Sequence, residues 1–223
     1  ETTPSFASFH TVATEHPSPL TKPRLLHYLK RYKKFPSKYR SLVWRFLLQL
    51  PEHEPAYDFF VRRGEHAAVD SLVKPYFVSD MNKNQKLVGR LKEVLSALVH
   101  WSPICGQLVY LPQLTFPFLL VHPRADDNCV VFETVVTFLL WWGSSWNVTF
   151  PNPPASVLHL ASALLAFQDS KLKEHLERHD FPPAKTVWPF MNSLLSEVLD
   201  REDWLIAWDY LLTYAHDPLF LPC

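Results

Sequence analysis

Apolar residues recur every three or four positions along most of the chain, which is the spacing of helices with one buried face. The segment 82–101 carries Leu91, Leu95 and Leu98 on one side and predicts a long amphipathic helix. The segment 129–146 is apolar nearly all round and predicts a helix at the centre of the fold. Similar patterns predict further helices over 22–34, 37–47, 56–63, 157–167, 171–179, 188–199 and 204–214.

No stretch of useful length alternates apolar with polar residues, so no strand is expected. The pattern therefore predicts an all-α protein, a single helical domain of roughly ten or more helices over 22–223. Residues 1–21 are rich in Ser, Thr and Pro and predict a flexible linker. Because the chain begins with Glu1 and ends in apolar sequence, we expect it to be a fragment of a longer protein.

Proline and capping residues predict where several of these helices begin and end. Asp126–Asp127 and Asp169 each precede an apolar run and can accept hydrogen bonds from the first free N–H groups of a helix. Pro103, Pro112 and Pro117 are expected to break the stretch between two long helices into short pieces.

The composition excludes several classes of protein. With only 4 Gly but 20 Pro, the chain is poorly suited to a dinucleotide-binding fold or a phosphate-binding loop, which need glycine at tight turns. Equal numbers of basic and acidic residues give a formal net charge of +0, so no long-range field of the whole chain draws the protein to nucleic acid or to an anionic membrane. We expect neither nucleic-acid binding nor a cofactor.

The cysteines and the longest apolar stretch bear on the compartment. Cys105, Cys129 and Cys223 are widely spaced and odd in number, so no disulfide framework and no zinc pattern is predicted. A reducing, cytoplasmic setting is the simpler interpretation. Glu133 and Gly143 interrupt the stretch 129–146, which predicts a buried helix and not a segment inserted into a membrane.

Two charged patterns allow more than one interpretation. The predicted helix over 22–34 is rich in Lys and Arg, and it either contacts phosphate or acidic lipid or, as we favour, forms a solvated face. His175 and His179 lie four residues apart on one helix face, a spacing that metal sites use. No third ligand is evident, so a structural role is favoured and no metal is predicted.

Several short motifs, in order, resemble the TBC domain, the fold of Rab GTPase-activating proteins. Arg40-Ser41-Leu42-Val43-Trp44 is similar to that family's opening Arg-x-x-x-Trp motif. Asp169-x-x-Leu172-x-x-His175-Leu176, Trp188-x-Phe190 and Trp208-Asp209-x-Leu211-Leu212 follow the order and spacing of its C-terminal half. The resemblance covers roughly residues 24–221. It implies that the motif residues Arg40, Trp44, Trp188, Trp208 and Asp209 are structural.

The resemblance also implies a mechanism that can be compared with this sequence. An active TBC domain inserts an Arg from an Ile-x-x-Asp-x-x-Arg motif and a Gln from a Tyr-x-Gln motif beside the nucleotide of a Rab. The Arg neutralises charge on the phosphoryl oxygens and the Gln orients the attacking water, an effect worth about 10³ to 10⁵ in rate for an arginine finger.

Both finger positions carry other residues in this chain. The segment 68–76 fits the Arg motif best when aligned on Leu72, which places Ser71 at the Asp position and Lys74 at the Arg position, unless Asp70 has shifted by one residue. Lysine keeps the charge but lacks the planar fork of a guanidinium. Pro75 follows it and has no backbone N–H.

The Gln motif departs from the family in the same way. Ser102-Pro103-x-x-Gly106 resembles the loop that precedes the motif, after which the family has Tyr-x-Gln-Gly. Here Val109 occupies the Gln position and Tyr110 the Gly position, while Gln107 comes two residues early and serves only if the register shifts. A valine side chain can neither donate nor accept a hydrogen bond.

The double replacement predicts a catalytically degenerate domain that binds other proteins as a scaffold. Two alternatives stay open: an active Rab GTPase-activating protein that uses Lys74 or Gln107 unconventionally, and an effector that holds a Rab-type GTPase without hydrolysis. The sequences 150–154 and 196–199 resemble the branch of the family that carries WD repeats, which implies a setting at centriolar satellites, the centrosome or the base of the cilium.

Overall fold

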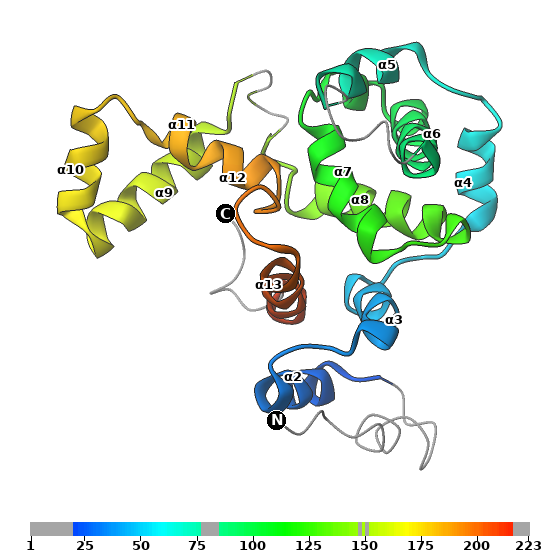
Figure 1. Ribbon diagram of the computed structural model, residues 1–223, viewed down its shortest axis with the longest axis horizontal. Helices are drawn as coiled ribbons and strands as arrows, with labels where there is room; N and C mark the ends of the chain where they lie inside the picture. Colours follow the sequence, from blue (N-terminus) through cyan, green and yellow to red (C-terminus); the bar gives the residue numbers. More distant parts are fainter. Residues whose placement is uncertain (1–19, 77–84, 147–148, 150–151, 216–223) are drawn as a thin grey trace. The chain divides into compact units, whose positions relative to one another are not determined.

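The computed structural model of the protein describes residues 20–76, 85–146, 149 and 152–215 (Figure 1). No strand occurs in these residues, so the predicted all-α fold is confirmed. The chain divides into two compact units: a terminal unit made of residues 1–49 and 201–221, and a central unit made mainly of residues 50–200. All but two residues of the predicted linker over 1–21 lie outside the described residues, and the single domain over 22–223 stays a prediction.

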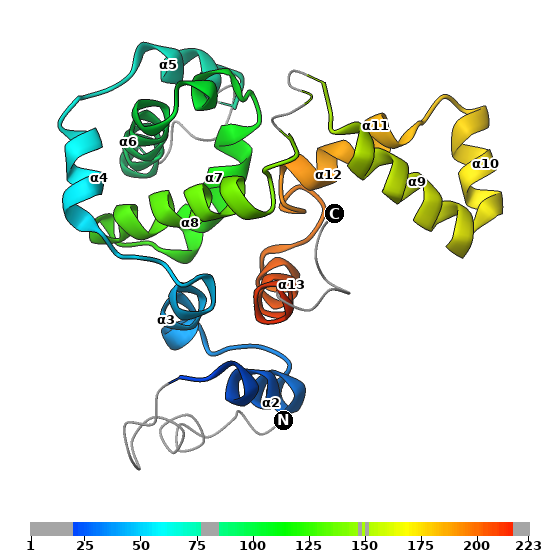
Figure 2. The ribbon, with the colours of Figure 1, turned by 180° about the vertical axis from the view of Figure 1, so that it is seen from behind.

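The terminal unit joins the two ends of the chain. It contains α2 (Lys22–Tyr32), α3 (Ser37–Leu48) and α13 (Arg201–Tyr214), and α13 packs against both α2 and α3 (Figures 1 and 2). Its core holds apolar side chains from α2, α3 and the turn between them: Leu25, Tyr28, Leu29, Phe35 and Val43.

The central unit is built around α6 (Gln85–Trp101). This helix lies inside a ring formed by α4 (Glu54–Val61), α5 (Ala67–Val73), α7 (Leu111–Val121) and α8 (Asn128–Trp141), as Figures 1 and 2 show. Apolar side chains recur along one face of α6, and its residues from Val94 to Val99 are all buried because neighbours cover it on several sides. In the described residues, short 3₁₀ helices lie between the helices of the ring: η1 (Lys74–Tyr76), η3 (Pro103–Gln107) and η4 (Ala125–Asp127).

The rest of the central unit is more exposed. It contains α9 (Ala155–Gln168), α10 (Ser170–Arg178), α11 (Pro183–Thr186) and α12 (Trp188–Asn192). Asp169 begins α10 as predicted, since its carboxylate accepts a hydrogen bond from the Leu172 N–H at 2.9 Å. Although α9 is rich in apolar residues, only Val157 of this helix is buried, and Phe167 is 84% exposed.

Several predicted boundaries were wrong. Pro117 lies inside α7, where burial on most sides offsets the backbone hydrogen bond that proline cannot donate. Asp127 precedes α8 but its side chain makes no capping bond, and α8 ends at Trp141 because the Gly143 N–H donates to the Phe138 carbonyl at 2.8 Å.

The helix predicted over 188–199 ends at Asn192. Leu194 and Leu195 follow in the left-handed region with φ of 53° and 67°, and the Leu195 N–H donates to the Phe190 carbonyl at 2.7 Å, a helix-ending arrangement that usually employs glycine. The helix α5 was not predicted, since it begins at a histidine cap that is not among the usual capping residues.

Candidate functional site

The position predicted to replace the arginine finger lies at the end of α5. Lys74 is the first residue of η1, its side chain is exposed, and its backbone N–H donates to the Asp70 carbonyl as α5 ends. Val69, Leu72 and Val73 of α5 are buried and fix the helix to the unit. Lys74 therefore projects from a firmly anchored helix into solvent.

The carboxylate of Asp70 is directed to a different cation. Its Oδ1 accepts a hydrogen bond from Lys92 Nζ of α6 at 2.5 Å, and the same Nζ lies 2.9 Å from Glu65 Oε1. Hydrogen bonding to Lys92 lowers the pKa of the Asp70 carboxyl and raises that of the Lys92 amine. Asp70 is thus engaged in a surface ion-pair network, and it does not orient Lys74.

The loop with the second finger position packs against α5. A side chain added at Gly106 in η3 would meet Val99 Cγ1 at 3.2 Å and Ala68 Cβ at 3.3 Å, so the backbone here approaches α6 and α5 too closely for any other residue without a shift. The structure therefore brings the two predicted finger segments, 68–76 and 102–110, next to each other on the central unit.

Residues 108–110 alternate between the core and solvent. Leu108 is fully buried and Tyr110 is 5% exposed, whereas Val109 between them is 68% exposed. The backbone of this loop is therefore fixed from both sides and presents position 109 outward. Gln107, the last residue of η3, is also exposed, but it precedes the outward position by two residues.

The Tyr110 ring points inward, so it does not cover the surface beside Val109. It packs edge-on against Trp188 at 5.5 Å and Trp146 at 6.1 Å between ring centroids. Its hydroxyl is buried and has no hydrogen-bond partner among the residues that the structure describes, and burial raises the pKa of Tyr110 to about 12. Trp188, predicted as a structural motif residue, thus belongs to an aromatic cluster of the central unit.

The other four motif residues lie in the terminal unit, where Asp209 of α13 is the centre of a buried polar cluster. Arg40 Nε lies 3.0 Å from Asp209 Oδ1, and the Trp44 Nε1–H donates to the same oxygen at 2.7 Å. The Phe35 backbone N–H donates to Asp209 Oδ2 at 2.8 Å. Trp208 is 3% exposed beside this cluster, with its ring 5.6 Å from that of Trp204.

This cluster joins segments from opposite ends of the described chain. Arg40 and Asp209 are only 6% and 0% exposed in their side chains, so each ion depends on the other for compensation. Burial raises the pKa of the Asp209 carboxyl, while the Arg40 guanidinium and the Phe35 and Trp44 N–H donors act in the opposite direction. The roles of Phe35 and Trp204 were not predicted. Phe35 acts through its backbone N–H, which any residue except proline has, and Trp204 belongs to none of the family motifs.

A second buried carboxylate supports the start of α4. Glu133 of α8 is 6% exposed and accepts hydrogen bonds from the backbone N–H groups of Glu52 at 2.8 Å and His53 at 2.7 Å. A charged residue inside an otherwise apolar helix was the sequence signal for such a role. Its donors are backbone groups, so this contact is structural and not catalytic.

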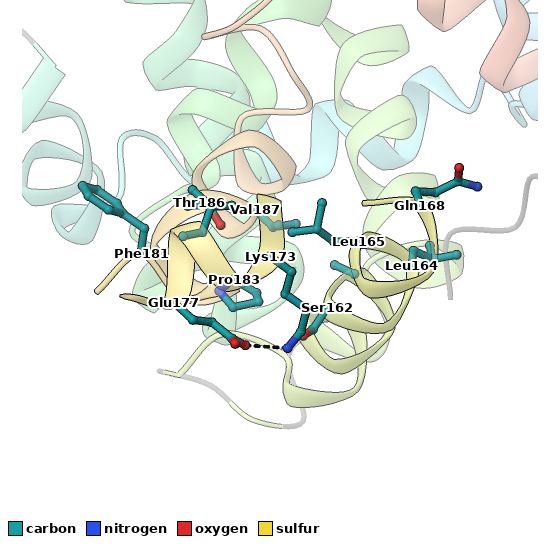
Figure 3. Close-up of a pocket in the computed structure, with 12 residues that line it drawn as sticks. Ser162, Leu164, Leu165, Gln168, Lys173, Glu177, Phe181, Pro183, Thr186 and Val187 are labelled. Atoms are coloured by element: carbon teal, nitrogen blue, oxygen red, sulfur yellow. Dashed lines mark hydrogen bonds and ion pairs between the residues drawn. The ribbon is translucent and has the colours of Figure 1, made fainter. Parts of the chain in front are cut away.

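The C-terminal helices of the central unit enclose a small groove of about 320 Å³ between α9, α10 and α11 (Figure 3). Its lining is mostly apolar, including Leu164, Leu165 and Phe181, and the ion pair of Lys173 with Glu177 at 2.6 Å lies at its edge. This pair joins successive turns of α10 on the helix surface, which is an ordinary stabilising contact. The groove contains no acid–base or nucleophilic arrangement.

Two histidines at the C-terminal end of α10 are candidate metal ligands. The rings of His175 in α10 and of His179, which follows the helix as its C-cap, lie 4.5 Å apart between centroids and are tilted by 55°. In the described part of the chain, no three His, Cys, Asp or Glu side chains gather as a metal site would require. Among the same residues, no helix is long and apolar enough to span a bilayer.

Comparison with known proteins identifies a set of vertebrate relatives. The chain is 38% identical over 213 residues to human TBC1 domain family member 31, and 41% identical over 202 residues to the mouse protein of that name. The protein of the fish Oryzias latipes is 38% identical over 218 residues. These alignments cover 96%, 91% and 98% of this chain but only 19%, 20% and 20% of the relatives. No family model and no solved structure matches the chain.

Proposed function

Because this chain belongs to the TBC domain family, we propose that it is a TBC domain without GTPase-activating activity that serves as a protein-binding module. One observation supports the proposal. The positions that the motif alignment assigns to the two fingers, Lys74 and Val109, are exposed on adjacent segments, and they do not carry the Arg and Gln of an active domain. Family membership alone does not establish catalysis, since function depends on the side chains of the site.

The first finger position lacks both the guanidinium and its support. Lys74 offers a point charge that cannot form the paired, planar hydrogen bonds of arginine to phosphoryl oxygens. The nearest carboxylate in sequence, Asp70, binds Lys92 instead. Among the described residues no carboxylate orients Lys74, and transition-state stabilisation depends on donors that are held in place before the reaction.

The second finger position is occupied by a side chain without polar atoms. Val109 is 68% exposed at the outward point of its loop, where an amide could otherwise reach and orient a water molecule. A shift of Gln107 into this position would have to move Leu108 and Tyr110, which are buried. A shift by two residues would move both side chains out of the places in which they are packed, and the loss of this packing opposes the use of Gln107 as a substitute.

The surface around position 109 favours contact with a protein. Ile104 and Val109 place apolar side chains on the same exposed loop, with exposures of 37% and 68%. An apolar group at the centre of an interface gains free energy on burial but performs no chemistry. This supports a second candidate function, in which a Rab-type GTPase is bound here and its nucleotide is not hydrolysed.

Single-turnover GTP hydrolysis over a panel of Rab proteins tests the loss of catalysis. We expect no acceleration by the chain, and because an arginine finger contributes about 10³ to 10⁵ in rate, even weak activity would be visible. The matched variants are Lys74→Ala and Lys86→Ala, which remove one exposed lysine each. Acceleration that disappears in the first variant and persists in the second would refute the proposal.

A pull-down with Rab proteins in three nucleotide states separates the candidate functions. A scaffold that does not use the Rab surface shows no dependence on nucleotide, and an effector binds the GTP form alone. Preference for the transition-state mimic indicates catalysis and contradicts the proposal. From the resemblance described above, we also propose that the module resides at centriolar satellites, the centrosome or the base of the cilium, which imaging of the tagged full-length protein tests directly.

A further inference from the structure

The helix α2 carries a surface charge that the proposed function does not use. We define its basic face by the exposed side chains of Arg24, Lys30, Arg31 and Lys33. On a helix with 3.6 residues per turn, Arg24, Lys30 and Arg31 lie on the side opposite the buried Leu25 and its neighbours. Lys33 follows immediately at the C-terminal end, where it extends the same charged surface.

No carboxylate of the surrounding sequence balances this charge. Residues 20–49 contain Lys and Arg but no Asp or Glu, although the chain as a whole has a formal net charge of +0. The acidic residues near α2 come from α13, where Glu202 pairs with Lys34 and Asp209 is buried against Arg40. The neutral total therefore conceals a local excess of positive charge.

The stability of α2 explains only part of this arrangement. Lys30 and Arg31 occupy its last turn, where cations interact favourably with the helix dipole. Arg24 occupies the first turn, which has no acidic residue and where a cation is unfavourable. The helix dipole therefore accounts for the two cations at the C-terminal end and does not account for Arg24.

We propose that the basic face of α2 binds the surface of anionic membranes. Clusters of Lys and Arg on an amphipathic helix are attracted to acidic lipid headgroups, with a contribution of about fivefold in partitioning for each side chain near the surface. Leu25, Tyr28 and Leu29 are already buried in the terminal unit, so the helix docks by charge and does not insert an apolar face.

The shape of the surface favours lipid over an acidic peptide or RNA. Arg24 and Arg31 are seven residues apart, or roughly 10 Å along the helix. These cations stand on a convex helix, and the groove described above is lined by other elements, α9 to α11. Laterally mobile headgroups can gather beneath such fixed charges, whereas a peptide would need a groove to align it. The inference does not depend on whether the domain is catalytic.

Vesicle cosedimentation with the whole chain tests the proposal. We expect binding to phosphatidylcholine vesicles that contain phosphatidylserine and none to phosphatidylcholine alone. Binding should disappear at about 1 M salt, where the screening length falls to about 3 Å. The variant Arg24→Gln/Lys30→Gln/Arg31→Gln should weaken partitioning by at least about tenfold, given the contribution of each cation.

The control variant Arg62→Gln/Lys86→Gln/Lys171→Gln removes three exposed cations from the central unit and should bind as the original chain does. Equal weakening by both variants, or no binding to acidic vesicles at low salt, overturns the proposal. So does an acidic peptide or an RNA that binds through the α2 cations while vesicles do not. Circular dichroism checks that each variant is folded, and the salt and lipid dependence of the original chain tests the idea without any variant.

Discussion

Replacing Arg40 by Met should destabilise the protein by about 3–5 kcal/mol, because it leaves a charged carboxylate buried without a counter-ion. Asp209 is fully buried, and among the described residues its hydrogen-bond donors besides Arg40 are neutral, the Phe35 N–H and the Trp44 Nε1–H. The Phe35 carbonyl also loses the bond from the Arg40 guanidinium at 2.9 Å. The cost is a large part of the roughly 5–15 kcal/mol that stabilises a typical domain.

A double-mutant cycle with Asp209→Asn isolates the charge. The asparagine keeps an acceptor for one of the neutral donors, so Arg40→Met/Asp209→Asn contains no unpaired buried ion. Its loss of stability should be smaller than the sum of the two single losses by about 2 kcal/mol or more. Urea unfolding followed by far-ultraviolet circular dichroism measures each free energy.

The pH dependence of the Arg40→Met variant gives an independent test. Burial already raises the pKa of Asp209 in the original chain, and loss of the guanidinium raises it further. A carboxyl whose pKa is higher in the folded than in the unfolded state favours folding below its unfolded pKa of about 3.9, and this contribution is lost as pH rises through the folded pKa. The penalty of the substitution should therefore shrink as the pH is lowered.

The matched control is Lys34→Met, which removes the partner of Glu202 from an ion pair of the same unit. Both of these side chains are more than half exposed, so the control should cost less than about 1 kcal/mol. If Arg40→Met costs no more than this control, the buried cluster does not hold the terminal unit together and the reasoning fails.

Three further outcomes follow from the central unit. Gly106→Ala should lower the free energy of unfolding in urea by about 1–3 kcal/mol, because the added carbon meets neighbours at 3.2 and 3.3 Å. Gly89→Ala, in open space on α6, should instead raise it by about 0.5–1 kcal/mol. Equal effects of the two substitutions would contradict this packing. Tyr110→Phe should be neutral or stabilising, since its buried hydroxyl lacks a partner; a loss above about 1 kcal/mol would reveal one. Cys105 and Cys129, whose burial raises each pKa to about 12, should resist iodoacetamide at pH 8 until the protein is unfolded, as peptide mass mapping would show.

Helices with a clear apolar period were predictable, and the errors have local physical causes. The spacing of Leu91, Leu95 and Leu98 indicated α6 because one face of that helix had to be buried. Proline rules predict a break at Pro117, but burial in the central unit sustains α7 through that residue. Leu194, just beyond the end of α12, has a left-handed backbone conformation that glycine usually adopts.

The candidate site was predictable in part. Alignment of short motifs selected Lys74 and Val109. It could not show that their two segments are adjacent, because the close approach of the Gly106 backbone to α5 and α6 is a tertiary contact. The engagement of Asp70 by Lys92 was equally hidden, since the two residues lie 22 positions apart and no motif links them. Long-range polar contacts of this kind leave no periodic signal.

The contrast between the two sets of motif residues explains how such a domain can keep its fold without its chemistry. Arg40, Trp44 and Asp209 are buried, so a change at one of them leaves an unpaired group and costs several kcal/mol. Lys74 and Val109 are exposed, and substitutions at such positions usually change stability by less than about 0.5 kcal/mol. Under the proposed function, loss of the finger side chains would therefore meet almost no resistance from folding, because both positions are exposed.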